Sequence, residues 1–291
     1  MPIAAIALVL VSCFAHAGWN LLIKRSDHAM GVMWWSLVVS LGLLSPVTAW
    51  FFLTGRSFSF PVWQCLMISS LGMGVYIYSL MRAYDGGDLS VVYPIARSTP
   101  LFVALWASIV LGERISVPGA VGIGLVVLAA VMLAAVGSAR ASGPTWGVGI
   151  GWAVLTALAS SVYSVADKAA MVQVEAGAGR VVYMHLQFAG MLAGLTLGGM
   201  GSGFWSRVRP GKDWRSVAGV GVFQPAAYLL VLMAMGMKGA PVSYIVAMRQ
   251  FSVVIGVVFG WRVLRESRGL ERLGPPLVMV AGWMLVAGVG Q

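Results

Sequence analysis

The sequence predicts an all-α integral membrane protein in which ten transmembrane helices form two inverted five-helix repeats. The first observation behind this prediction is hydrophobicity, because 59% of the 291 residues are hydrophobic, 10% are charged and the mean hydropathy is +0.90. Soluble domains carry about 25% charged residues. The second observation is that apolar stretches near the roughly 20 residues needed to cross a bilayer recur along the whole chain. The third is that unusual residues of the first half return in the second.

Ten apolar segments are separated by short polar loops. They cover about residues 3–23, 30–53, 62–83, 89–111, 117–136, 146–170, 180–200, 216–236, 240–262 and 273–290. The first apolar stretch resembles a signal peptide, but no lysine or arginine precedes Lys24, so a retained first helix is favoured. A proline removes a helical hydrogen bond, so Pro94, Pro100 and Pro225 predict bends in the fourth and eighth segments.

The chain divides near its midpoint into two repeats, at 1–138 and 145–291, that match in their special residues. Matching pairs are Trp19 with Tyr163, Lys24 with Lys168, Tyr76 with Tyr228, and Arg97 with Arg249. Because each repeat has an odd number of spans, the second enters the membrane upside down relative to the first. Inverted repeats hold their substrate at the repeat interface near the bilayer midplane.

The two arginines are the leading candidates for a substrate site. Arg97 lies between Pro94 and Pro100 in the fourth apolar segment, and Arg249 lies in the ninth. A charge near the bilayer centre costs roughly 2.5–3.5 kcal/mol, so it normally faces a partner or a watered cavity. We expect both arginines to face one cavity, with Arg249 as the main ligand of an acidic group and Arg97 as the more structural residue. The alternative is that both bond backbone carbonyls and only hold the repeats together.

Further candidates lie in or beside the spans. Lys24 and Lys168 are candidates for anion binding, although lysines at helix ends commonly extend to the membrane interface. The polar and aromatic candidates are Trp19, Asn20, Trp35, Tyr76, Tyr93, Gln224 and Tyr228. Aromatic residues are also common in contacts between helices. His16 and His185 are candidates for proton coupling because imidazole titrates near neutrality, or for hydrogen bonds inside the bundle.

The charges within the spans favour an anionic or zwitterionic substrate. The acid found there, Asp167, lies beside Lys168 near a helix end, so the sequence places no acid in the middle of a span.

Glycines predict close helix packing through a ladder at Gly190, Gly194 and Gly198. Two further glycine pairs either mark close helix packing in the same way or reflect only the high glycine content of membrane proteins. They are Gly147 with Gly151 and Gly256 with Gly260.

Several functional classes are excluded. The sequence contains no His-Glu-x-x-His, Gly-x-Ser-x-Gly or Walker motif, so no enzyme and no cofactor are expected. Its two cysteines have neither a metal-ligand spacing nor a disulfide framework, so no metal is expected. The net charge is +10, but the basic residues form no run, so no nucleic acid partner is expected. The expected partners are the lipid bilayer and a small-molecule substrate, bound by a monomer or weak homodimer.

The two five-span halves, the stretch from Pro94 to Pro100, and Leu111-Gly112-Glu113-Arg114 with its echo at 264–266 resemble the drug/metabolite transporter superfamily, and within it the bacterial EamA-type members. The resemblance implies a central cavity lined by both halves and secondary transport of a small metabolite by alternating access. It also implies a plasma-membrane protein. The stretch 16–20 with Lys24 is similar to a branch associated with phosphonate catabolism.

The sequence therefore predicts a secondary transporter of a small organic anion or zwitterion, such as a carboxylate, an amino acid or a phosphonate-like compound. The alternatives are an exporter of drugs or other cationic or neutral compounds, and a flippase-like or accessory subunit. Ten spans place both termini on one side of the inner membrane. The loops on the side of the membrane away from the termini contain twelve basic residues, and the loops on the side of the termini contain four. Basic loops normally lie in the cytoplasm, so this count places the termini outside. The family resemblance implies cytoplasmic termini, and both orientations stay open.

Overall fold

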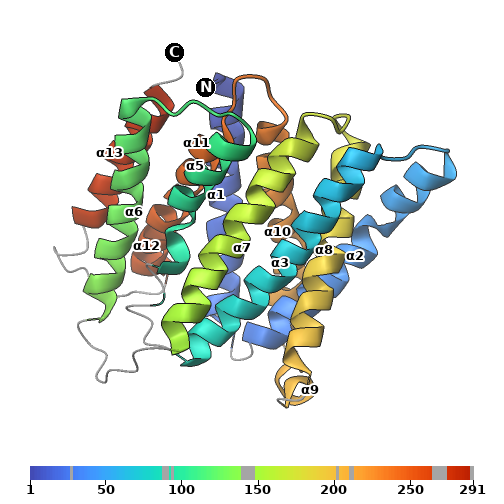
Figure 1. Ribbon diagram of the computed structural model, residues 1–291. Coiled ribbons are helices and arrows are strands. Elements are labelled where there is room, and N and C mark those ends of the chain that lie inside the picture. Colours follow the sequence, from blue (N-terminus) through green and yellow to red (C-terminus); the bar gives the residue numbers. More distant parts are fainter. Residues whose placement is uncertain are drawn as a thin grey trace.

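The computed structural model describes residues 1–26, 29–86, 92, 95–138, 148–200, 203–209, 213–263 and 274–288, and the regular structure in these ranges is helical (Figure 1). The first half contains α1 (Ile3–Lys24), α2 (Ala29–Leu53), α3 (Phe60–Gly86), α5 (Thr99–Val110) and α6 (Val117–Ser138). The second half contains α7 (Val148–Met171), α8 (Ala178–Gly199), α9 (Phe204–Arg207), α10 (Trp214–Met235), α11 (Val242–Arg249), α12 (Phe251–Val263) and α13 (Gly274–Gly288).

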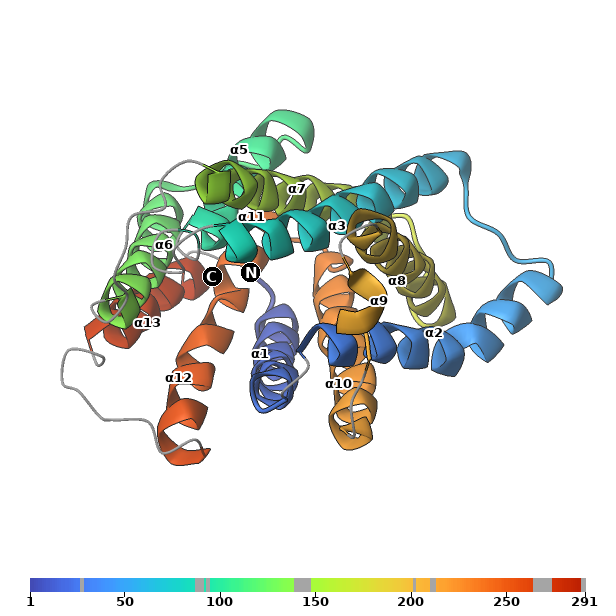
Figure 2. The ribbon, with the colours of Figure 1, turned by 90° about the horizontal axis from the view of Figure 1, so that it is seen from below.

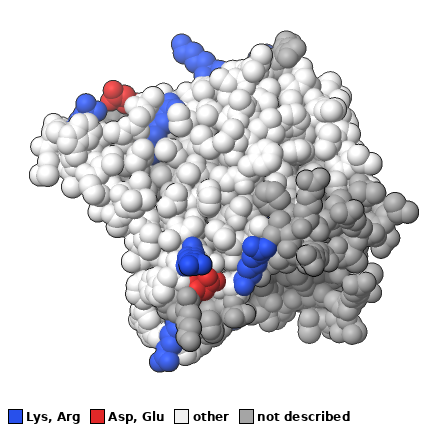
Figure 3. Space-filling model, turned by 180° about the vertical axis from the view of Figure 1, so that it is seen from behind, with Lys and Arg blue, Asp and Glu red and all other residues white. Residues whose placement is uncertain are grey.

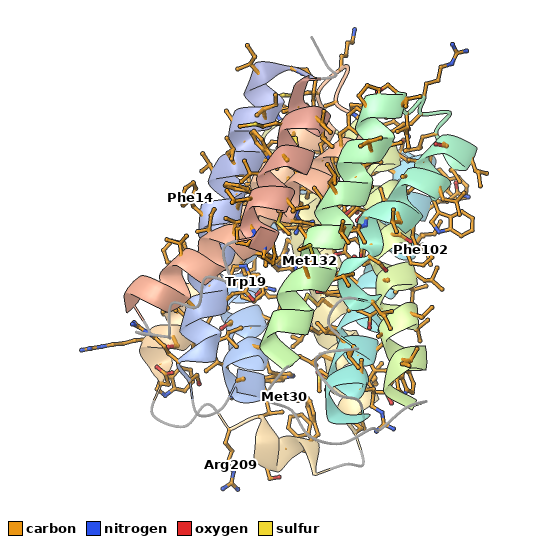
Figure 4. All side chains as sticks on the ribbon, turned by 90° about the vertical axis from the view of Figure 1, so that its left-hand side faces the viewer. Phe14, Trp19, Met30, Phe102, Met132 and Arg209 are labelled. Carbon is orange, nitrogen blue, oxygen red and sulfur yellow. The ribbon has the colours of Figure 1, made fainter. Side chains whose placement is uncertain are left out.

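The helices have the length and surface of membrane spans. Six of the described helices, α1, α2, α3, α7, α8 and α10, are long and apolar enough to cross a membrane, and shorter apolar stretches lie in α5, α6, α11–α12 and α13. Large apolar side chains on the outside, such as Phe14 and Leu71, are more than half exposed (Figure 4 shows Phe14). On the described part of the face shown in Figure 3, charged side chains form an upper and a lower group, with an uncharged area between them. The chain is therefore a multi-pass membrane protein.

Hydrogen bonds and close contacts between helices give the helix directions. Helices α2 and α10 are parallel, because Ser36 donates to the Val217 carbonyl and Ser40, one turn later, to the Gly221 carbonyl, at 3.0 and 2.8 Å. Helices α3 and α8 are also parallel. Antiparallel contacts join α1 to α10 (Ser12 with Ala227, Leu22 with Gly219), α3 to α7 (Ser69 with Asp167, Ser79 with Thr156), and α2 to α8 (Trp34 with Thr196, Thr48 with His185).

These relations make the two halves equivalent in packing and opposite in direction. Followed from helix to helix, they require α1 and α7 to run in opposite directions. Exchanging the halves turns the α1–α10 contact into α7–α3, the α2–α10 contact into α8–α3, and the α1–α12 contact into α7–α5, and all six contacts are present. Viewed from below, α12, α1 and α10 follow one side of the molecule, and α7 and α3 follow the other (Figure 2).

The predicted glycine ladder is confirmed as a contact between α8 and α3. An added Cβ on Gly194 would lie 2.3 Å from the Cα of Gly74. Gly190 and Gly198, one turn away on either side, face Ser70 and Tyr78 in the same way. Helices α3 and α8 approach this closely because neither Gly74 nor Gly194 carries a side chain.

The two additional glycine pairs do not show such a contact. An added Cβ on Gly151 or Gly256 has no neighbour within 4 Å, and Gly147 and the surroundings of Gly260 lie outside the described residues. A close approach that the sequence did not predict joins α6 and α13, where a Cβ on Gly282 would lie 2.7 Å from the Gly122 carbonyl oxygen.

The ninth predicted segment, expected as one helix over 240–262, is divided into α11 and α12. The break lies at Gln250, whose N–H donates to the Ala247 carbonyl three residues back, at 3.1 Å. The Cys13 thiol of α1 lies 3.7 and 3.6 Å from the carbonyl oxygens of Met248 and Arg249, directly before the break. The break therefore adjoins one of the two predicted site arginines.

The prolines behave differently from one another. Pro100 lies in the first turn of α5, where the missing N–H removes no helical hydrogen bond, so α5 begins beside Arg97. Pro225 lies inside α10, which continues as one helix to Met235. Pro94 lies outside the described residues.

Candidate functional site

A cavity of about 240 Å³ lies between the two halves of the chain. Its wall contains residues of α1, α2, α3 and α5 from the first half, and of α7, α11 and α12 from the second, together with the break at Gln250. Arg97 and Arg249 both line it, so the structure brings the two predicted arginines to one cavity. None of the described lining residues is an aspartate or glutamate.

A smaller lobe of about 100 Å³ adjoins this cavity, because the two share lining residues that include Trp19, Tyr76 and Arg249. The side chains that line the small lobe alone come from α3, α8 and α10. They are Met73, Ile77, Phe188, Met191 and Ala227, which are apolar, and Gln224 and Tyr228. The site therefore has a polar chamber and a mostly apolar one, with Arg249 lining both.

The two arginines have different surroundings. The Nη1 of Arg97 donates to the Gln250 Oε1 at 3.4 Å, so it connects the residues just before α5 to the helix break in the other repeat. The guanidinium carbon of Arg249 lies 5.5 Å from the centre of the Tyr228 ring, a distance at which a cation is attracted to the aromatic face. Within the described part of the chain, no residue accepts a hydrogen bond from the Arg249 guanidinium.

Most of the predicted site residues lie in this cavity. His16, Trp19, Asn20 and Tyr76 line the large cavity with the arginines, and Gln224 and Tyr228 line the small lobe. Three of them take part in local contacts. The Asn20 Nδ2 donates to the His16 carbonyl at 2.7 Å, and the His16 and Trp19 rings meet edge to face at 4.8 Å.

Three predicted residues lie away from the cavity. The Lys168 Nζ donates to the carbonyls of Met235 and Ala240, at 2.6 and 2.9 Å, so it connects α7 to the end of α10 and the start of the next segment. The Trp35 Nε1 donates to the Val208 carbonyl at 3.0 Å. His185 lies between Thr48, at 2.6 Å, and the Leu41 carbonyl, at 3.1 Å. Tyr93 and the side chain of Lys24 lie outside the described residues.

A polar stripe on α7 was missed as part of the site. Thr156, Ser160 and Ser164 line the large cavity together with Tyr163. The signal was present in the sequence, because residues spaced four apart share one face of a helix. A row of hydroxyl groups on one face of an otherwise apolar span is typical of a surface that faces a cavity or another polar side chain.

The stripe ends in Asp167, which does not pair with the adjacent Lys168. Asp167 is fully buried, and its carboxylate accepts hydrogen bonds from three other helices. The Ser69 hydroxyl donates at 2.5 Å, the Tyr183 hydroxyl at 3.0 Å and the Gln187 amide at 3.1 Å, and the Tyr228 hydroxyl also donates. Since Tyr228 lines the small lobe, this network forms the layer directly behind the site.

A second carboxylate joins the two repeats at the start of α11. Glu113 of the first repeat accepts hydrogen bonds from the N–H groups of Val242 and Ser243, at 2.7 and 3.3 Å, and from the Ser243 hydroxyl at 2.7 Å. A carboxylate at this position satisfies free N–H groups and complements the positive end of the α11 dipole.

Replacing Glu113 by glutamine is expected to lower the free energy of unfolding by about 1–2 kcal/mol, because the charge-assisted bonds to α11 are lost. The measurement is unfolding of purified protein in mixed micelles by sodium dodecyl sulfate. Glu175→Gln is the control, since Glu175 is exposed and pairs with Arg56 only at 3.8 Å. Equal stabilities of the two variants would contradict the role given to Glu113.

The comparisons with known proteins agree with this architecture. No curated protein matches the chain. A solved structure titled "Crystal structure of protein" has a TM-score of 0.74 and 16% sequence identity, with 98% of each chain covered, so it shares the fold. The profile of the EamA-like transporter family matches residues 3–135 and 147–288, one region in each half. The chain therefore belongs to the EamA-like transporter family and is a membrane transporter of the drug/metabolite type.

Proposed function

We propose that the chain is a secondary active transporter of a small organic anion or zwitterion, and that it works by alternating access around the cavity between the repeats. In this proposal ten spans cross the inner membrane as inverted repeats at 1–138 and 145–291. The opposite directions of α1 and α7 support the inversion. The start of α1 and the end of α13 lie at the same end of the molecule (Figure 1), as an even number of spans requires.

The observation that carries this proposal is the charge of the cavity. Arg97 comes from the first repeat and Arg249 from the second, and both line one cavity in which none of the described lining residues carries a carboxylate. A cation held away from water binds an anionic group strongly, and the planar guanidinium matches a carboxylate or phosphonate with two parallel hydrogen bonds. Because Arg249 has no recorded hydrogen-bond acceptor in the described residues, it is the better placed of the two to bind such a group.

The two arginines are expected to respond differently to lysine. Arg249→Lys keeps the charge but loses the planar fork, so binding of the acid should weaken by about 1–3 kcal/mol with folding nearly intact. Arg97→Lys should instead lower the melting temperature, because the contact with Gln250 across the repeats is lost. Ligand-induced thermal stabilisation by a panel of carboxylates, amino acids and phosphonates measures the first effect, and the melting temperature of the free protein measures the second.

Lipophilic amines and the variant Arg56→Lys serve as controls. Arg56 forms an exposed ion pair, so its replacement should change neither binding nor melting. Stabilisation by amines in preference to acids would count against an anionic substrate and favour an exporter of cationic compounds. Normal acid binding by Arg249→Lys, or loss of binding without loss of stability in Arg97→Lys, would reverse the roles of the two arginines.

A further inference from the structure

The small lobe has the features of a ligand pocket and not of a packing defect. Its side walls are apolar and well buried, and Met73, Phe188 and Met191 are each less than 5% exposed. Gln224, which is 7% exposed, brings an amide to this apolar wall, and its buried Oε1 has no hydrogen-bond partner among the described residues. Buried amide oxygens are nearly always paired, so this oxygen calls for a donor, supplied by water or by a polar group of a ligand whose apolar part lies against the apolar wall.

The volume of the lobe limits what it can hold. An engineered protein cavity of 150 Å³ binds benzene, which has six carbon atoms. In proportion, a lobe of about 100 Å³ holds a group of about four carbon atoms. A branched or short linear aliphatic group fits this volume, whereas a fused two-ring group does not.

The position of the lobe relative to Arg249 decides how such a group would enter. Arg249 lines both the small lobe and the large cavity, and Tyr228, whose ring faces its guanidinium, belongs to the wall of the lobe. An acidic group bound to Arg249 therefore lies at the junction of the two chambers. The part of the ligand next to its acidic group has the apolar lobe on one side and the hydroxyl-lined cavity on the other.

We propose that the small lobe is the specificity subsite of the transporter, and that it receives a compact apolar group of about four carbon atoms from a substrate whose acid binds Arg249. This inference rests on the proposed function, because it takes the Arg249 guanidinium as the ligand of the acid. It adds that the substrate is an amphipathic acid, with its apolar end enclosed by α3, α8 and α10.

The test is a series of linear aliphatic monocarboxylates with chains of two to nine carbon atoms, with affinity measured by ligand-induced thermal stabilisation. In the unaltered protein, the dissociation constant should fall about fourfold for each methylene added until the lobe is full, after about four. Longer acids should gain nothing more or bind more weakly. An affinity that does not change with chain length would overturn the proposal.

Two substitutions should change, in opposite directions, the chain length at which the affinity stops increasing. Ala227→Leu fills the lobe and should make the affinity independent of chain length, whereas Met191→Ala enlarges it and should shift the best ligand to acids two or three carbons longer. Met184→Ala is the matched control, since Met184 is buried in the same helix but lines neither chamber. The proposal fails if Met191→Ala leaves the preferred length unchanged, or if Met184→Ala shifts it equally.

Arg249→Lys and the uncharged carboxamides of the same series separate this inference from the proposed function. If both hold, Arg249→Lys weakens all acids by the same factor and leaves the dependence on chain length intact. If the acid site is wrong but the subsite is right, acids and carboxamides show the same chain-length dependence and Arg249→Lys has no effect. If the subsite is wrong, acid binding depends on Arg249 but not on chain length.

Discussion

Replacing Asp167 by alanine is expected to lower the free energy of unfolding by about 2–5 kcal/mol, the largest effect among the substitutions considered. The carboxylate accepts hydrogen bonds from side chains on α3, α8 and α10, and the hydroxyls of Ser69, Tyr183 and Tyr228 lose this acceptor together. The Gln187 amide also loses it and keeps only its contacts with Ser69 and Tyr228. Each orphaned donor costs about 1–3 kcal/mol in a protein interior, and interhelical bonds in membranes average about 0.6 kcal/mol. The measurement is unfolding in mixed micelles by sodium dodecyl sulfate.

Two further variants show whether the loss of stability in Asp167→Ala comes from the hydrogen-bond network. Asp167→Asn keeps the shape but turns one acceptor into a donor that faces other donors, so its stability should fall between those of the alanine variant and the unaltered protein. Glu175→Ala removes an exposed carboxylate and should change stability by less than about 0.5 kcal/mol. A stability of Asp167→Ala equal to that of Glu175→Ala would show that the network does not hold these helices together.

Replacing Gly194 by alanine is expected to cost about 3 kcal/mol. The added Cβ would lie 2.3, 2.8 and 2.9 Å from the Cα, carbonyl carbon and carbonyl oxygen of Gly74, which are backbone atoms, so no side-chain rotation relieves the contact. Helices α3 and α8 would have to move apart along the whole ladder, and overpacking of this kind typically costs about 1–3 kcal/mol and occasionally more. The same mixed-micelle titration measures it.

Gly151→Ala is the matched control for the glycine ladder. Gly151 also lies inside a spanning helix, but an added Cβ has no neighbour within 4 Å. Alanine is a better helix former than glycine by up to about 1 kcal/mol, so this variant should be unchanged or slightly stabilised. Similar losses in both variants would mean that glycine content, and not the ladder, sets the stability.

The sequence predicted the features that depend on local length and spacing. Eight of the ten apolar segments, all but the fourth and the ninth, agree with single helices to within a few residues, because about 20 residues are needed to cross a bilayer whatever the fold. The ladder at Gly190, Gly194 and Gly198 was predictable because its period of four is the period of one helix face. The cavity position of Arg97 and Arg249 followed from the cost of burying a charge.

The features that depend on distant partners were not predictable. Asp167 and Lys168 are adjacent in the chain and look like an ion pair, but successive residues on a helix point about 100° apart, so they face different neighbours. Lys168 binds two backbone carbonyls, and Asp167 binds side chains of helices far along the chain. The division of the ninth segment at Gln250 carries no proline or glycine, so no local signal marks it.

The buried network of Asp167 makes the two repeats unequal, with a consequence for the resting population of the transporter. Since Lys24 matches Lys168, Ile23 matches Asp167, and Ile23 lines the open cavity where Asp167 is sealed in hydrogen bonds. If transport exchanges the conformations of the two repeats, Asp167 would leave its hydrogen-bond network in the opposite conformer. Ile23 would take the equivalent buried position, where an isoleucine forms no hydrogen bonds. Every 1.4 kcal/mol of that difference is a tenfold bias, so the unloaded protein should rest almost entirely in the conformer described here.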